Sequence, residues 1–345
     1  MAGLLALLLV AGVFLPEPAP ESARSGSAAA ASDVVACGGP GADAALCAEA
    51  ERLRRAADPE RPRAGPVPPE IDPGGDSCGN RYPRLYAEVP VALAERFAVV
   101  AFAQDGDLRL RMLAELREEV ESRPELLHRA ILEEVRTAIR ARKLDLAAQK
   151  LAELEPLDVR VAAPCRSDSA LYRGMIAAAR GDRAAAAESF ARAVAFDPLS
   201  FLARAALVEA LYLTLTGPFV DARTCVAATA DFLEHFHELR RLVTDAPQLL
   251  EFVETLAARR KSGAVVELAL AFAYAWGGAG PEALRRTDAV AREAGALPRA
   301  CAGLLIEAAD RLRATLAPPP APGPTPSPAD PRRAAAFAPA GRSAG

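Results

Sequence analysis

The stretch that decides the fold is Ala170–Pro198, which reads ALYRGMIAAARGDRAAAAESFARAVAFDP. It is rich in helix-forming residues on both sides of Gly181, where a helix can end in the left-handed conformation. Pro198 stops the second helical run, because the residue before a proline is disfavoured in helical geometry. Gly174 and Ala186 are small enough for two helices to cross at close range. The stretch therefore predicts two antiparallel helices joined by a tight turn.

Similar turns recur along the chain, and apolar residues follow helical spacing from Leu85 to Leu316. Gly106, Gly181 and Gly280 are each followed, 17 or 18 residues later, by a proline. Each gap fits one helix of about 14 residues, about 21 Å long. The remaining turns are expected at Asp105-Gly106-Asp107, Arg142-Lys143, Gly217-Pro218 and Gly278-Ala279-Gly280. Recurring hairpins predict an all-α fold of stacked antiparallel helical hairpins.

The segment from residue 167 to 200 resembles a tetratricopeptide repeat (TPR). The positions that match this motif are Gly174, Gly181, Ala186, Phe190, Ala193 and Pro198. The motif has a large residue where Ala170 stands and a tyrosine where Ala177 stands, so slimmer packing is expected here. The resemblance is clear over this segment and looser over about 230 residues. It implies a TPR-like solenoid.

The resemblance also implies a binding surface, because the first helix of each TPR hairpin lines a groove for peptides or proteins. Transferred to this chain, the groove residues are Asp168, Leu171, Met175 and Ala178. The alternative is that this hairpin only stacks against its neighbours.

Four segments are expected. Residues 1–31 are interpreted as an export signal or membrane anchor with a linker, because Leu4–Leu15 is a short apolar run. Residues 32–83 are rich in Cys and Pro and mostly irregular, with one short helix from Asp43 to Ala57. Residues 84–316 form the helical domain. Residues 317–345 are a Pro/Ala-rich tail that is predicted to be disordered.

Composition and charge exclude some classes of function. The chain has 345 residues, of which 51% are hydrophobic and 25% charged, as in a folded protein with a core. Its net charge of -4 provides no general attraction to nucleic acid or to an anionic membrane. A membrane contact is expected only through the N-terminal segment, if that segment is retained.

The six cysteines lie outside metal-type spacings. An even number behind an export signal permits disulfides, and Cys37 with Cys47 is the pair that the sequence favours. Cys225 and Cys301 fit a disulfide or two separate buried thiols equally well. Attachment of a lipid at Cys37 is a further alternative, although polar chain separates this cysteine from the apolar run.

No motif indicates catalysis, a cofactor or a metal site. His128 is expected at the surface or half-buried, and His235 and His237 point in different directions on one helix. Acidic clusters such as Glu133-Glu134 are interpreted as solvated faces. The predicted function is an exported or envelope-associated, non-enzymatic scaffold for a protein or peptide partner. The alternatives are an enzyme that acts on an envelope polymer through carboxylates, or a structural subunit of an envelope assembly.

Overall fold

The computed structural model describes residues 37, 43–60, 65–86, 88–215, 221–243, 246–259 and 263–317. Regular structure in these residues is helical throughout, which confirms the all-α prediction. The predicted export segment 1–31, the turn Gly217-Pro218 and the tail from residue 318 lie outside the described residues. The first elements are α2 (Ala44–Ala56), α3 (Cys78–Arg81), the 3-10 turn η1 (Pro83–Tyr86), α4 (Val91–Phe102), α5 (Gly106–Val120), α6 (Pro124–Arg140) and α7 (Leu144–Ala152).

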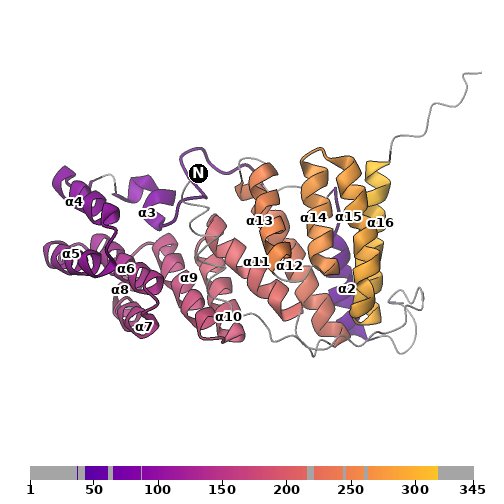
Figure 1. The fold of residues 1–345 in the computed structure, drawn as a ribbon, viewed down its shortest axis with the longest axis horizontal. Coiled ribbons are helices and arrows are strands. Elements are labelled where there is room, and N and C mark those ends of the chain that lie inside the picture. Colours follow the sequence, from indigo (N-terminus) through magenta and orange to yellow (C-terminus); the bar gives the residue numbers. More distant parts are fainter. Residues whose placement is uncertain are drawn as a thin grey trace, which may run out of the picture.

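The elements continue to the C-terminal side with α8 (Glu155–Asp158), α9 (Ala163–Ala179), α10 (Arg183–Phe196), α11 (Phe201–Leu215), α12 (Ala222–Leu242), α13 (Ala246–Arg259), α14 (Ala264–Trp276), α15 (Gly280–Glu293), the 3-10 turn η2 (Ala294–Ala296) and α16 (Arg299–Leu316). Figure 1 shows the helices side by side in an elongated row, with α4 near one end and α16 at the other. Helices that follow one another in sequence pack together, for example α9 with α10 and α14 with α15.

The turns form where the sequence supplies residues that tolerate left-handed backbone. Gly181 has a φ of 84° and Gly278 a φ of 78°, and both follow the end of a helix. Arg142 takes up the same region with a φ of 59°, at the turn between α6 and α7. Asp182 begins α10, since its side chain accepts a hydrogen bond of 3.0 Å from the Ala185 N–H.

The α9–α10 pair shows how small residues set the distance between helices. A Cβ placed on Gly174 would overlap the ring of Phe190. Phe190, Ala186 and Ala193 are all buried. Pro198 follows the end of α10, as expected. The ring of Phe190 therefore takes the space in which Gly174 has no side chain.

α2 packs far from its neighbours in sequence, against α12 and α16 (Figure 1). Leu53 of α2 is buried in the main core. Arg52 forms an ion pair with Asp231 of α12, and Arg54 lies 3.3 Å from Glu307 of α16. The helix matches the one expected from Asp43 to Ala57, but its place in the helical domain was not expected from the sequence.

The described cysteines form three pairs at disulfide distance. Cys37–Cys47 is the pair favoured by the sequence. Cys225 pairs with Cys301 and joins α12 to α16, so the interpretation as two separate thiols is wrong. The third pair, Cys78–Cys165, attaches α3 to the start of α9.

Most of the apolar core is continuous from α2 and α6 to α16. A separate cluster holds α4, α5 and the start of α6 together through Phe97, Val100, Leu113 and Leu116, among others. In α14, ten of the 13 residues are buried. None of the described helices combines the length and hydropathy that a bilayer span requires.

Candidate functional site

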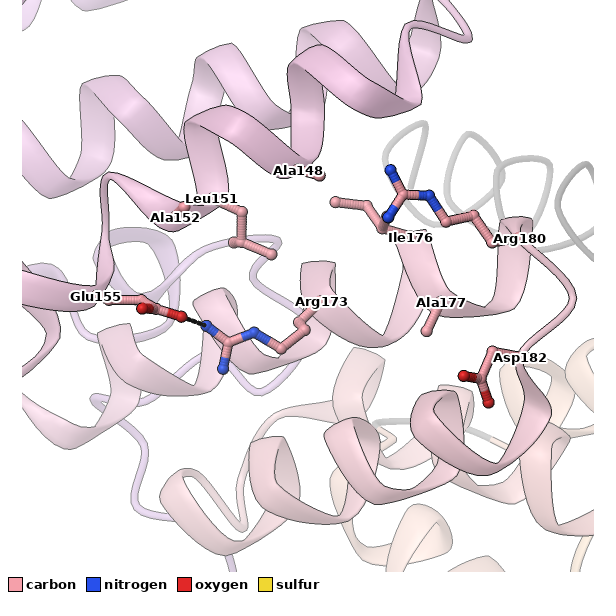
Figure 2. Close-up of a pocket in the computed structure, with 9 residues that line it drawn as sticks. All are labelled: Ala148, Leu151, Ala152, Glu155, Arg173, Ile176, Ala177, Arg180 and Asp182. Atoms are coloured by element: carbon pink, nitrogen blue, oxygen red, sulfur yellow. Dashed lines mark hydrogen bonds and ion pairs between the residues drawn. The ribbon is translucent and has the colours of Figure 1, made fainter.

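An open pocket of about 370 Å³ lies between α7 and α9 (Figure 2). This volume falls in the range of small-ligand and peptide side-chain sites. α7 contributes Ala148, Leu151 and Ala152 to the lining, and α9 contributes Ile176 and Ala177. The rim is charged and consists of Glu155, Arg173, Arg180 and Asp182.

Small side chains create the space. Leu151 and Ile176 are buried and form an apolar floor. Beside them stand three alanines, Ala148, Ala152 and Ala177, where larger residues would fill the gap between the helices. Ala177 is the position at which the sequence resemblance leads one to expect a tyrosine, so the pocket lies where slimmer packing was predicted.

Among the described side chains, each of the two rim arginines has one ion pair, and both pairs are exposed. Arg173 lies 3.2 Å from Glu155, and Arg180 lies 2.8 Å from Asp145. Such surface pairs contribute about 1 kcal/mol or less, so either guanidinium can exchange its partner for a ligand. Arg180, which caps the end of α9, stands seven positions after Arg173, a rise of about two helical turns or about 10 Å.

The two acidic side chains of the rim differ in their hydrogen-bond partners. Asp182 caps α10 and is therefore partly satisfied by the backbone N–H of Ala185. Within the described part of the chain, the Glu155 side chain is bonded to Arg173 alone. The pocket thus presents an apolar floor between two guanidinium groups that a carboxylate-bearing ligand can recruit.

The four residues predicted to line a groove are buried instead. Asp168, Leu171, Met175 and Ala178 are each between 1% and 8% exposed. In the structure Leu171, Met175 and Ala178 belong to the apolar core, and Asp168 is a buried polar residue of α9. The expectation of an open groove over these side chains is therefore wrong.

Asp168 is buried because the segment of the same chain that contains Cys78 and Arg81 covers it. Arg81 donates hydrogen bonds to Asp168 at 2.7 Å and to Asp197 at 2.8 Å. Asp168 also accepts a bond of 2.6 Å from the backbone N–H of Cys78, next to the Cys78–Cys165 pair. Tyr82 donates to Asp197, and burial together with this bond raises the pKa of the Tyr82 hydroxyl.

A Ser/His/Asp group is present but lacks the arrangement of a catalytic triad. Ser169 Oγ lies 3.0 Å and Asp158 Oδ1 lies 3.2 Å from the same nitrogen, Nε2 of His128. In a triad the serine and the aspartate bind opposite nitrogens of the imidazole ring. His128 and Ser169 are each 1% exposed, so a substrate cannot reach them. The prediction of a surface or half-buried His128 is wrong, because α6 places the imidazole inside the protein, in contact with Asp158 and Ser169.

Two further sequence expectations concern charged and metal-binding groups. Glu134 is buried and lies 2.9 Å from Arg117 and 3.3 Å from Lys150, so its interpretation as part of a solvated face is wrong. A carboxylate at this depth needs cations from neighbouring helices. Among the residues that the structure describes, no group of three His, Cys, Asp or Glu side chains is arranged to hold a metal ion.

Sequence reasoning missed the Arg81 contacts and the pocket rim. Arg81, Asp168 and Asp197 are far apart in sequence, and no spacing rule connects them. One feature of the sequence indicated the pocket: alanine stands at position 177, where the TPR motif has a tyrosine. Compared with models of known protein families, with curated proteins and with solved structures, the chain shows no significant match.

Proposed function

We propose that this protein is an exported or envelope-associated scaffold of TPR-like helix pairs, non-enzymatic, which binds a protein or peptide segment in the pocket between α7 and α9. The observation that carries the proposal is the combination of an open apolar floor with Arg173 and Arg180 at its rim. The fitting ligand is an extended segment with one apolar side chain flanked by acidic residues. The apolar side chain would lie on Leu151 and Ile176, and the acidic residues would pair with the arginines.

Export is supported by the three cysteine pairs, because disulfides persist in oxidising compartments. The apolar run Leu4–Leu15 of the sequence supports it independently. A fusion of the full chain to alkaline phosphatase tests this part, since that enzyme is active only after export. An inactive fusion that accumulates in the cytosol would refute it.

Two features weigh against the enzyme alternative. The buried carboxylates of Asp168 and Asp197 both bind Arg81, so neither is free to act as a general acid or base. The Ser169–His128 pair is buried, and neither residue lines the pocket.

Selection of peptides from a random phage-displayed library on the full chain tests the pocket. We expect selected peptides to carry an apolar residue between acidic ones and to bind at least tenfold more weakly to Ala177→Tyr. That variant places a phenol ring in the space between the helices. Ala184→Tyr is the matched control, because Ala184 is exposed on α10 and does not line the pocket.

Two further measurements test the role of charge in peptide binding: its dependence on salt and the effect of Arg180→Glu. Affinity should fall with ionic strength, and Arg180→Glu should weaken binding without lowering the melting temperature. Peptides that bind the wild type, Ala177→Tyr and Ala184→Tyr equally would show that the pocket is not the binding site.

A further inference from the structure

The helix row exposes apolar side chains mainly at one end. The described residues include seven large hydrophobic side chains that are exposed, and five of them lie between residues 85 and 108. Phe102 is 80% and Val91 is 74% exposed, the highest values of the five. The five are Leu85, Val91, Val99, Phe102 and Leu108. Three of these, Val91, Val99 and Phe102, lie on one helix, α4. Exposed apolar side chains gathered on one face mark a contact surface, whereas scattered ones do not.

The centre of this surface is the side of α4 that points away from α5. α4 packs chiefly on α5 and buries Phe97 and Val100. At 100° per residue, the opposite side of the helix presents Val91, Glu95, Ala98, Val99 and Phe102. All five are exposed, and together they are called the α4 face below.

The two ends of the row differ in a way that matters for solubility. Stacked helical proteins need terminal helices with a polar outer side. α16 lies at one end (Figure 1), and it exposes the charged residues Asp310 and Arg311. At the other end α4 presents the apolar α4 face. Among the residues that the structure describes, the row therefore has no polar cap at the α4 end, and one more helix would continue the packing.

Glu95 sets the chemistry of what can cover the α4 face. It lies one turn from both Val91 and Val99, and among the described residues it has no ion pair or side-chain hydrogen bond. The neighbouring Arg96 is already paired with Glu119 of α5. A partner that covers Val91 and Val99 also covers this carboxylate, which is unfavourable unless the partner supplies a cation.

We propose that the α4 face docks an amphipathic helix of another protein, whose apolar side carries one lysine or arginine opposite Glu95. A helix fits because α4 ends a row of helices packed side by side. α4 has 12 residues and offers a ridge of about 18 Å. This contact is independent of the pocket between α7 and α9.

Charge argues against the two other occupants. A second copy paired through the same face would place two Glu95 carboxylates close together, because Glu95 is near the middle of α4. An anionic bilayer would meet Glu95 and the exposed Glu88. Only a cationic partner converts Glu95 into a favourable contact.

The test uses the full chain and two fluorescent helical peptides of about 18 residues, about 27 Å long. Both have a leucine side and a glutamine side, and they differ in one residue at the centre of the leucine side, lysine or glutamate. By fluorescence anisotropy, the wild type should bind the lysine peptide at least tenfold more tightly. Glu95→Lys should reverse this preference.

Variants at exposed positions distinguish specific binding at the α4 face from nonspecific hydrophobic binding elsewhere. Phe102→Ser should weaken binding of the lysine peptide at least tenfold and leave the melting temperature unchanged. Val159→Ser is the matched control, because Val159 is 83% exposed outside the α4 face, and it should bind as the wild type does.

Four results would overturn the proposal. The first is equal affinity of the wild type for both peptides. The second is an equal loss of binding in Val159→Ser and Phe102→Ser. The third is a dimer in light scattering that Phe102→Ser dissociates, which would identify a second copy as the occupant. The fourth is binding to vesicles of phosphatidylethanolamine and phosphatidylglycerol that Phe102→Ser abolishes, which would identify a membrane.

Discussion

Arg81 donates a hydrogen bond of 2.7 Å to Asp168, and both side chains are almost completely removed from solvent. The contact joins the segment before α4 to the inner side of α9. With the Cys78–Cys165 pair, it holds the chain itself over a surface that the sequence suggested was open to a partner.

Removal of Arg81 should therefore destabilise the protein strongly. Arg81→Leu leaves the carboxylates of Asp168 and Asp197 buried without their cation, at a cost of about 3–5 kcal/mol in the free energy of unfolding. Urea denaturation measures this change. Arg84→Leu is the control, because Arg84 is exposed. Equal stability of Arg81→Leu and Arg84→Leu would show that the buried ion pairs do not hold the segment.

Gly174→Ala should also destabilise, because its new Cβ overlaps the ring of Phe190. Overpacking of this kind costs about 1–3 kcal/mol. The second substitution Phe190→Leu should recover part of the loss, which a double-mutant cycle of thermal unfolding measures. Gly280→Ala is the control, since a Cβ there meets open space. A stable Gly174→Ala would mean that α9 and α10 are not in close contact at this point.

The three cysteine pairs should differ in their contributions to stability according to the chain length that they close. Cys225–Cys301 spans 76 residues and Cys37–Cys47 spans 10. The chain-entropy relation predicts about 4.5 kcal/mol for the long loop and about 2.7 kcal/mol for the short one. Calorimetry of the two double-alanine variants under oxidising conditions tests the order. A larger loss without Cys37–Cys47 would contradict it.

The stability of the protein should fall as the pH drops from about 6.5 to about 4. Burial, with the neighbouring Arg204, lowers the pKa of His235 from 6.5 to about 4. Arg204 can only donate, so its bond of 2.9 Å requires an unprotonated Nδ1 on His235. Between these pH values the unfolded chain binds a proton that the folded chain does not, so the stability from neutral His235 is full above pH 6.5.

The expected loss at pH 4 is on the order of 2 kcal/mol, since each pKa unit corresponds to about 1.4 kcal/mol and His235 keeps partial contact with solvent. Urea denaturation at a series of pH values measures it. His235→Gln should remove this part of the pH dependence, and His128→Gln serves as the comparison. An unchanged pH profile in His235→Gln would show that another group is responsible.

Local patterns predicted the helical class and many of the turns. Gly181 follows the end of α9 in left-handed geometry, and Pro198 follows the end of α10. These features depend on residues close together in sequence, so periodicity and turn chemistry are sufficient to predict them. The gap at Ala177 also followed from a local comparison of side-chain size.

The sequence by itself determined that the chain forms helices, where several of them end, and that Cys37 and Cys47 are close enough to pair. Only the tertiary structure decided that α2 packs on α12 and α16, that Cys225 meets Cys301, and that Asp168 is covered by Arg81. The physical reason is the distance along the chain over which each effect acts. Backbone propensities and the closure of small loops depend on residues that are close together in sequence. Burial and charge pairing instead depend on which distant side chains the packed helices bring together.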